Sequence, residues 1–349
     1  MRVTDKRVTG KRVTGKRVSD DVRPRPRAEP IPSEGADGLF TQTWFPVCLS
    51  SALPATGGIV GVDLLGGRVV AVRSSSGEVS VFSAYCVHLG ADLSVGRLDG
   101  DAIRCAFHGW RYGMDGRCLS ANGTPVDPRA RLFRFPTVET HGIVWAFNGS
   151  APLFTLPQPD PPMPQAPVAT RTLAFDQELA VDPWVVAAQT MDLQHFALPH
   201  EGKFVEDPDD SVAWDAFSVG YRYHALMPGG EEYRVWASIH GSNIFWQQGT
   251  LDGRWFYWIT GMAAPRPRTT ASFFSWGTHV LPGETREAAD DFLTRVQAFM
   301  FNLLAEDAPV LMTIHYTPGL LTRSDAALAG FFSYLRSYPR ANPARDFLR

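Results

Sequence analysis

Two short segments that each pair a cysteine with a histidine constrain the fold more than any other feature of the chain. The first contains Cys86 and His88, separated by one residue. The second begins after sixteen intervening residues and contains Cys105 and His108, separated by two residues. Thiolates and imidazoles at such spacings are metal ligands. The fold must therefore bring two loops together so that these four side chains face one metal centre.

This ligand set indicates a Rieske [2Fe–2S] cluster, in which two cysteines bind one iron and two histidines bind the other. Neutral imidazoles make such a cluster less negative, so it accepts an electron at a higher potential than an all-cysteine cluster. A zinc site with the same two cysteines and two histidines is the alternative. The remaining cysteines, Cys48 and Cys118, have no ligand pattern around them and are expected to be ordinary buried thiols.

The residues that follow each ligand pair, 90–93 and 109–112, resemble the loops of the Rieske domain in aromatic-ring-hydroxylating oxygenases. The resemblance favours an iron–sulfur cluster over zinc. One departure is Leu89, where that family usually has Arg. The respiratory type of Rieske protein is a poorer match, because Ala91 and Phe107 stand where that type has its additional cysteines.

The pattern of the chain predicts a disordered tail and two domains. Residues 1–40 repeat a basic five-residue unit and then become Pro-rich, which is typical of disorder. Residues 41–150 read as short strands separated by Gly-containing turns, so we expect an antiparallel β domain. A Pro-rich connector follows, and residues 151–349 form the second domain.

The second domain mixes predicted helices with long aromatic strands and is therefore expected to be α+β. Helical patterns cover 181–195, 285–314 and 324–338, with Pro309 expected to kink or interrupt the second of them. Strand-like runs cover 211–226, 233–248, 254–262 and 270–280. The family resemblance implies a helix-grip (START/Bet v1-like) arrangement, with one curved antiparallel sheet.

A second group of candidate ligands lies in the second domain. His195 and His200 are five residues apart, and Asp192 precedes them. The segment resembles the Asn-x2-Asp-x2-His-x4-His motif of Rieske oxygenases, although Gln189 stands at the Asn position. The resemblance implies that an Asp near the C-terminus completes a two-histidine, one-carboxylate site for mononuclear Fe(II). The matching residue is Asp307, with Glu306 as the alternative.

The resemblance also implies how electrons travel. A separate NAD(P)H-dependent reductase, with or without a ferredoxin, reduces the cluster, because the chain has no dinucleotide-binding Gly motif. The cluster of one subunit serves the iron of its neighbour in a homotrimer. Asp192 matches the residue that bridges a cluster ligand, His108, and an iron ligand, His195. A carboxylate between two imidazoles would fix both rings and connect the two metal sites.

The function expected from these features is O₂-dependent monooxygenation of a small, hydrophobic or aromatic substrate, by C–H hydroxylation or by oxidative O- or N-demethylation. A cis-diol-forming dioxygenase is one alternative. A Rieske electron carrier fused to an iron-free ligand-binding domain is another. Aromatic residues on the predicted strands suit an apolar pocket, and about half of them should face it. They are Trp236, Phe245, Trp246, Trp258 and Phe274.

Charge and hydropathy exclude some other partners. The total charge is −3, but residues 1–27 carry ten Lys or Arg against three Asp, so the remainder of the chain is at −10. An acidic body argues against nucleic acid as the main partner. No apolar run reaches the roughly 20 residues of a membrane helix, and no signal peptide is evident. The expected location is therefore the cytoplasm.

Overall fold

The computed structural model describes residues 29–314 and 321–348. The basic repeats, in residues 1–28, lie outside this part of the chain, so the expectation of disorder there stays a prediction. Residues 29–40, which we also assigned to the tail, pack on the protein instead. Ile31 and Phe40 are buried, and the carboxylate of Glu34 accepts hydrogen bonds from the backbone and the side chain of Thr41. The apolar side chains in this short segment explain the difference.

The N-terminal domain consists of small antiparallel sheets, as the sequence predicts. One has the order β10-β5-β4-β3, a second β11-β12-β2 and a third β6-β7-β8-β9. The strands of the first two are β2 (Trp44–Leu49), β3 (Gly58–Leu64), β4 (Gly67–Arg73), β5 (Val79–Ser83), β10 (Arg134–Phe135), β11 (Thr137–Thr140) and β12 (Ile143–Phe147). Those of the third are β6 (Arg97–Asp99), β7 (Ala102–Arg104), β8 (Arg111–Gly113) and β9 (Cys118–Ser120).

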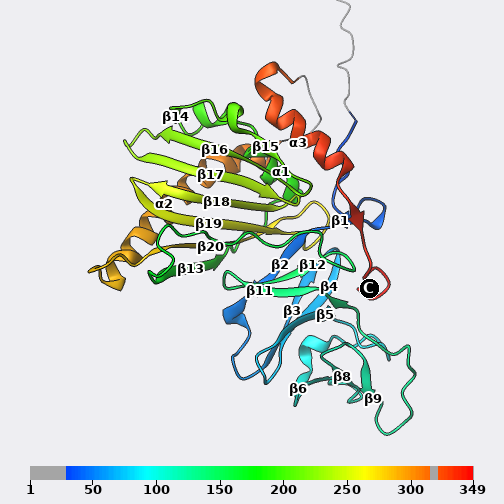
Figure 1. The fold of residues 1–349 in the computed structure, drawn as a ribbon. Coiled ribbons are helices and arrows are strands. Elements are labelled where there is room, and N and C mark those ends of the chain that lie inside the picture. Colours follow the sequence, from blue (N-terminus) through cyan, green and yellow to red (C-terminus); the bar gives the residue numbers. More distant parts are fainter. Residues whose placement is uncertain (1–28, 315–320, 349) are drawn as a thin grey trace, which may run out of the picture.

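The C-terminal domain is built on one large antiparallel sheet with the strand order β13-β20-β19-β18-β17-β16-β14, and β15 pairs with β16. Its strands are β13 (Val168–Ala174), β14 (Lys203–Phe204), β15 (Ala213–Trp214), β16 (Ser218–Leu226), β17 (Glu232–His240), β18 (Ile244–Leu251), β19 (Arg254–Ala263) and β20 (Ala271–His279). The helices are α1 (Pro183–Gln189), α2 (Arg286–Leu311) and α3 (Ala326–Ser337). Figure 1 shows α2 running along one face of the sheet. The expected α+β fold with one curved sheet is confirmed.

Short 3₁₀ helices connect these elements, at Ala36–Gly38, Ser50–Ala52, Leu93–Val95, His195–Ala197, Pro208–Ser211 and Arg323–Asp325. Apolar side chains between the large sheet and its helices form the largest core of the described chain. From the helices it takes Val186, Phe292, Val296 and Phe331, among others. Burial of this face fixes α1 and α2 against the sheet. One candidate iron ligand lies on α2, and the other two follow α1 in the chain.

Several elements differ from the expected ones. The run 211–226 holds two strands, β15 and β16, which pair with each other. The run 233–248 is a hairpin rather than one strand, because Gly241 turns the chain between β17 and β18 with a φ of +61°. The expected helix over 181–195 ends at Gln189, and 3₁₀-type turns follow it. Helix α2 continues through Pro309 to Leu311, so the proline lies in its last turn and does not interrupt it.

The two domains share a buried aromatic interface. Trp145 and Phe147 of β12 pack with Trp246 of β18 and Tyr257 of β19. The end of the chain returns to the N-terminal domain: β21 (Arg340–Ala341) pairs with β1 (Phe40–Thr41), and Leu348 joins the core of that domain. The boundary at residue 150 therefore does not separate the chain into two independent packing units. In the part of the chain that the structure describes, no helix is long and apolar enough to span a membrane.

Candidate metal centres

The two loops that carry the cluster-ligand candidates have the same backbone construction. The carbonyl of Cys86 accepts from the N–H of Gly90 at 2.8 Å, and that of Cys105 accepts from the N–H of Gly109 at 3.1 Å. Both glycines have a positive φ, +74° and +71°. The N–H of each cysteine also donates to the carbonyl five residues on. Each loop thus curls around its own cysteine, with glycine where the backbone turns left-handed.

These loops bring the four predicted cluster ligands to one end of the N-terminal domain. Cys86 and Cys105 are buried, whereas His88 is exposed and its ring centroid lies 4.7 Å from that of His108. Burial raises the pKa of the Cys86 thiol, and the Cys105 thiol adds to this rise. Such a buried pair is a poor place for free thiolates but a suitable one for thiolates bound to iron. The residues present therefore fit a Rieske cluster.

Two neighbours of these ligands have roles that the sequence analysis did not assign. The Tyr112 hydroxyl accepts from the N–H of Val87 at 3.2 Å and lies 3.0 Å from the Cys86 sulfur, to which it can donate. The ring of Trp110 stacks on that of His88, with centroids 4.7 Å apart and planes within 5°. A hydrogen bond to a ligand sulfur tunes the cluster potential, and stacking fixes the imidazole. Both residues lie in the segment 109–112 that carried the family resemblance.

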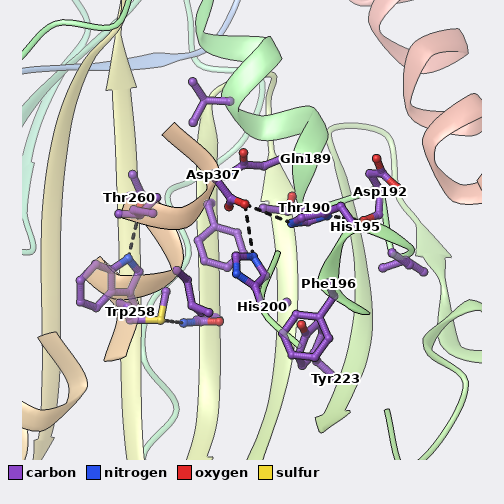
Figure 2. Close-up of a pocket in the computed structure, with 18 of the residues that line it drawn as sticks. Gln189, Thr190, Asp192, His195, Phe196, His200, Tyr223, Trp258, Thr260 and Asp307 are labelled. Carbon is purple, nitrogen blue, oxygen red and sulfur yellow. Dashed lines mark hydrogen bonds and ion pairs between the residues drawn. The ribbon is translucent and has the colours of Figure 1, made fainter. Parts of the chain in front are cut away.

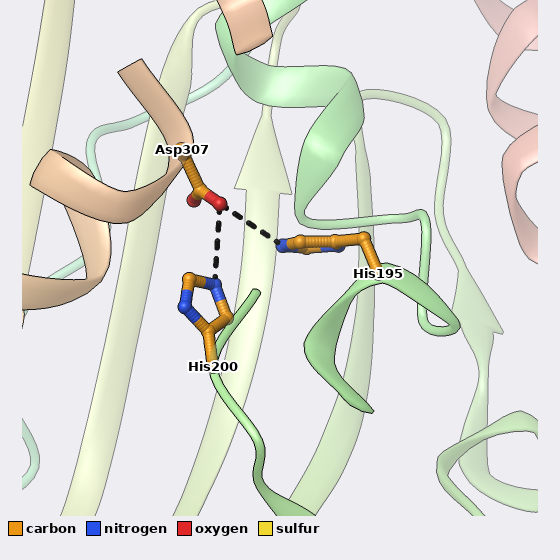
Figure 3. Close-up of side chains that lie close together, drawn as sticks. All are labelled: His195, His200 and Asp307. Carbon is orange, nitrogen blue, oxygen red and sulfur yellow. Dashed lines mark ion pairs between the residues drawn. The ribbon is translucent and has the colours of Figure 1, made fainter. Parts of the chain in front are cut away.

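The second group of predicted ligands also converges. His195 and His200 come from the turns after α1, and Asp307 comes from α2 (Figure 3). The Oδ1 atom of Asp307 lies 3.3 Å from Nε2 of His200 and 3.9 Å from Nε2 of His195. One ligand atom from each residue lies within 4.8 Å of the others, which is the arrangement that a single ion requires.

The outer nitrogen of each histidine is held by a hydrogen bond, so both Nε2 atoms face inward. Nδ1 of His195 bonds to the Asp192 carbonyl, and Nδ1 of His200 lies 2.6 Å from Oε2 of Glu306. Donation from Nδ1–H leaves Nε2 with a lone pair for a metal. Glu306 therefore contacts the outer nitrogen of His200, away from the metal position. Asp307 is the carboxylate that faces both Nε2 atoms.

Electrostatics at His200 follow from this double contact. Burial lowers the pKa of the imidazole, but hydrogen bonds to Asp307 and Glu306 outweigh it, and the pKa is raised overall. A metal ion at Nε2 would take the place of the proton between His200 and Asp307, while Nδ1–H continues to donate to Glu306. Two imidazoles and the buried carboxylate of Asp307, with Glu306 beside them, suit a divalent cation.

A mainly apolar cavity of about 110 Å³ adjoins the triad (Figure 2). Of the five aromatic residues considered for a pocket, Phe245 and Trp258 line it. Trp246 packs at the domain interface, Phe274 lies in the core, and Trp236 is 38% exposed. The other lining residues are Val186, Gln189, Thr190, Asp192, Leu193, Phe196, Tyr221, Tyr223, Tyr233, Ala237, Gln247, Thr260, Met262, Met300, Leu303 and Leu304.

Asp192 lies at the margin of the iron-ligand group. Its backbone carbonyl accepts a hydrogen bond from Nδ1 of His195. Its half-buried carboxylate has no hydrogen-bond partner among residues 29–314 and 321–348. Figure 1 places the small sheet β6–β9, which borders the cluster loops, at the far end of the molecule from α1. The structure therefore does not bring Asp192 and His108 together within one chain, and the bridging role stays a prediction.

Comparison with known proteins agrees with this arrangement. Residues 43–136 match the family model of the Rieske [2Fe–2S] domain. The oxygenase subunit of 3-chlorobenzoate-3,4-dioxygenase from Comamonas testosteroni is 36% identical over 117 residues, which are 32% of this chain and 27% of that protein. The oxygenase component of 3-ketosteroid-9-alpha-monooxygenase from Rhodococcus rhodochrous is 37% identical over 105 residues, 30% of this chain and 27% of that protein. The matched segments span about a quarter of both relatives.

Solved structures extend the likeness to the second domain. NdmA from Pseudomonas putida CBB5, solved with caffeine, superimposes with a TM-score of 0.67 at 19% identity, covering 84% of this chain and 90% of that one. The N-terminal domain is thus a Rieske [2Fe–2S] domain, on a chain with the fold of NdmA. The chain is a homologue of the oxygenase components of Rieske non-haem iron oxygenases. The predicted kinship and the [2Fe–2S] cofactor are confirmed, and the roles of single site residues stay predictions.

Proposed function

We propose that this chain is the oxygenase component of a Rieske non-haem iron enzyme, with mononuclear Fe(II) held by His195, His200 and Asp307. The observation that carries the proposal is the convergence of two inward Nε2 atoms and one carboxylate oxygen on an apolar cavity. When bound, Fe(II) would supply the activation of O₂, with electrons from the Rieske cluster.

The residues around that site have separable tasks. Glu306 and the Asp192 carbonyl hold the two imidazoles in the tautomer that a metal needs. Phe245, Trp258 and their apolar neighbours would orient a substrate and keep water away from it. The cavity is small, so a substrate bound there has its reacting carbon close to the triad.

Monooxygenation of a small hydrophobic or aromatic substrate, by hydroxylation or oxidative demethylation, is the reaction we favour. NdmA, which has this fold, was solved with caffeine, a compact ring compound. One of the relatives is named 3-ketosteroid-9-alpha-monooxygenase. A cis-diol-forming dioxygenase is the second candidate, because 3-chlorobenzoate-3,4-dioxygenase is also a relative. The intact ligand triad disfavours an electron carrier fused to an iron-free binding domain.

We further propose that electrons arrive from a separate reductase and cross between subunits of a homotrimer, from the cluster of one chain through Asp192 to the iron of its neighbour. Exposed apolar side chains surround the cluster ligands: Val87 is 42% exposed, Leu89 67% and Phe107 64%. Such a patch suits contact with another protein surface. The unpaired carboxylate of Asp192 suits an imidazole supplied by that surface.

Substrate-dependent O₂ consumption by the reconstituted holoenzyme with a surrogate reductase tests this proposal. The expected product from ¹⁸O₂ carries one labelled atom, or none after demethylation, in which the label leaves with the aldehyde. Incorporation of two labelled atoms would assign the dioxygenase reaction instead. A chain that consumes no O₂ with any compound of this class, while its cluster is reduced normally, would support the electron-carrier alternative.

A further inference from the structure

Three tyrosines line the cavity from adjacent strands of the large sheet, Tyr221 and Tyr223 from β16 and Tyr233 from β17. Tyr221 and Tyr223 are two residues apart, so their side chains lie on the same face of the strand. Tyr223 is paired with Val235 across the ladder, and Tyr233 comes two residues before Val235, which places the third ring on that face as well. The sheet thus presents three phenols to one cavity.

Two of the three phenols are occupied within the fold. The Tyr221 hydroxyl donates to the carbonyl of Thr190, just after α1, and the Tyr233 hydroxyl donates to Oε1 of Gln247 on β18. Each of these donors stabilises a contact between two elements and is not free to bind a ligand. Another polar atom, Oε1 of Gln189, has no partner, but it is fully buried and therefore closed to the cavity.

The hydroxyl of Tyr223 differs from all of these groups. It makes no hydrogen bond within the described chain and, unlike Oε1 of Gln189, it is not fully buried, so it opens onto the cavity that Tyr223 lines. A hydroxyl without a partner in mainly apolar surroundings is costly compared with a hydrogen-bonded one. Its partner must therefore enter the cavity from outside, as water or as a polar atom of a ligand.

Aromatic packing holds this hydroxyl in place without a hydrogen bond. The Tyr223 ring lies edge-to-face against the rings of Phe196, Phe204 and Tyr233, with centroids 4.8, 4.9 and 5.3 Å away. These contacts fix the plane of the ring, and the direction of its C–O bond is fixed with it. The hydroxyl is therefore preorganised, because a ligand that binds to it does not have to order the side chain first.

Tyr223 also lies close to the metal-ligand triad. Phe196, which its ring contacts, packs in turn on His200 with centroids 5.6 Å apart, and Figure 2 shows Phe196 and Tyr223 beside each other below His200. Burial raises the pKa of the Tyr223 phenol well above its ordinary value, and the charges of neighbouring tyrosines and of Asp307 add to the rise. The phenol therefore stays protonated and is a neutral donor beside the triad.

The rest of the lining limits what a ligand of this hydroxyl can carry. The described lining has no Lys or Arg, and its two carboxylates, on Asp192 and Asp307, would repel an anion. An ammonium group has no lone pair and cannot accept a hydrogen bond from a phenol. A carbonyl or ether oxygen is a neutral acceptor and meets both conditions. The aromatic and aliphatic side chains around it suit a mainly apolar ring.

We infer that Tyr223 is the polar anchor of the cavity, and that its hydroxyl donates to a carbonyl or ether oxygen of an uncharged, mainly apolar ring compound. Because the anchored oxygen is held beside the triad, this contact determines which carbon of the compound faces the metal site. The inference rests on the proposed function and deepens it, since it names the substrate class of the same site.

Two ring compounds of the same shape test the inference without turnover. Acetophenone has a carbonyl oxygen where α-methylstyrene has a methylene group, so only acetophenone accepts a hydrogen bond. Their binding to the anaerobic full-length holoenzyme is measured by equilibrium dialysis in sealed cells, for the wild type and for Tyr223→Phe. The variant should bind acetophenone about fivefold or more weakly, as for one lost hydrogen bond, and α-methylstyrene within about twofold of the wild type.

The control Tyr221→Phe removes a neighbouring hydroxyl that is already paired with the Thr190 carbonyl. It frees an acceptor but no donor, so the ratio of the two affinities should stay within about twofold of the wild-type ratio. Equal weakening of both compounds in Tyr223→Phe, an unchanged ratio in that variant, or a ratio that changes as much in Tyr221→Phe would each overturn the inference. Absence of acetophenone binding to the wild type at millimolar concentration would overturn it too.

Stability gives a second readout that needs no ligand. The Tyr223 hydroxyl has no partner in the described fold, so Tyr223→Phe should leave the urea midpoint unchanged or raise it. Tyr221→Phe should lower the midpoint, because it breaks a hydrogen bond between β16 and the residue after α1. A fall in Tyr223→Phe as large as that in Tyr221→Phe would assign the Tyr223 hydroxyl a structural partner and contradict the inference.

Neither measurement depends on catalysis. If acetophenone binding responds to Tyr223→Phe as expected but the protein never consumes O₂, the anchor stands and the proposed oxygenase reaction fails. If O₂ is consumed with ring compounds while Tyr223→Phe binds both probes like the wild type, the reaction stands and the anchor fails.

Discussion

At the scale of single residues, the adjacent acids Glu306 and Asp307 show what a sequence can and cannot decide. Both matched the expected position of the third ligand, and the pattern favoured Asp307 without excluding its neighbour. Successive side chains on a helix point about 100° apart, so the two carboxylates reach different sides of His200. The structure brings Asp307 to Nε2 and Glu306 to Nδ1 of that ring.

This arrangement predicts that Glu306 tunes metal affinity without being a ligand. Glu306→Gln should weaken Fe(II) binding about tenfold, because a neutral amide holds the His200 ring less firmly and makes it less basic. Competition with a chelator, followed by iron analysis, measures the change while the visible spectrum reports on the cluster. The control Asp291→Asn alters an exposed acid on the same helix. Complete loss of the mononuclear iron in Glu306→Gln would instead make Glu306 the ligand.

The cluster ligands could be predicted because their spacing in the sequence identifies them. The roles of the residues around them could not be predicted in this way. Tyr112 and Trp110 gain their roles from contacts across the loops, to the Cys86 sulfur and the His88 ring. Tyr223 belongs to no motif in the sequence, and its open hydroxyl is visible only once the cavity exists. Spacing reveals ligands, whereas supporting contacts depend on how the elements pack.

At the scale of elements, the strands and long helices followed their hydrophobic periodicity, and the differences arose at turns. The hairpin between β17 and β18 was missed because apolar residues continue on both sides of Gly241. A side chain there would meet Thr43 of the N-terminal domain. Glycine is therefore needed at this position because of a tertiary contact, and hydrophobic periodicity carries no information about tertiary contacts. Helix α1 ends at Gln189, and the turns after it carry His195 and His200.

The end of strand β17 carries a partly buried histidine that should make stability depend on pH. Burial lowers the pKa of His240 to about 4, although Asp215 acts in the opposite direction. Between pH 6.5 and 4 the unfolded chain binds a proton that the folded chain does not, so stability falls as the pH falls through this window. From pH 7 to 5 the loss is about 2 kcal/mol.

His240→Gln removes this titration, and therefore its free energy of unfolding should fall less than that of the wild type between pH 7 and 5. Urea unfolding of both proteins at the two pH values measures the difference, since other titrating groups contribute equally to both. Parallel losses of stability in the two proteins would show that folding does not lower the pKa of His240.

At the scale of the whole molecule, the two domains pack through Gly261 of β19 and the indole of Trp145. A Cβ at Gly261 would lie 2.3 Å from that ring. Gly261→Ala should therefore destabilise the protein by about 1–3 kcal/mol through overpacking. Combination with Trp145→Phe, which removes the clashing ring atoms, should restore part of this loss in a double-variant cycle. Strictly additive effects in chemical denaturation would contradict the contact.

The proposed electron transfer between subunits also belongs to the scale of the whole molecule. A Cys105→Ser chain should lack the cluster and an Asp307→Asn chain should lack the mononuclear iron, so each alone should be inactive. If electrons cross between chains, oligomers reconstituted from a mixture of both should recover part of the wild-type turnover. Mixed oligomers verified by mass spectrometry that stay inactive would assign transfer within one chain.

The central claim is that one chain carries both a Rieske cluster and a separate mononuclear iron. The most direct measurement is the iron content of the anaerobically reconstituted protein, combined with that of the Asp307→Asn variant. The account predicts about three iron atoms per chain in the wild type and about two in the variant, with the same cluster spectrum in both. About two iron atoms in both proteins would contradict it, since the triad would then hold no iron.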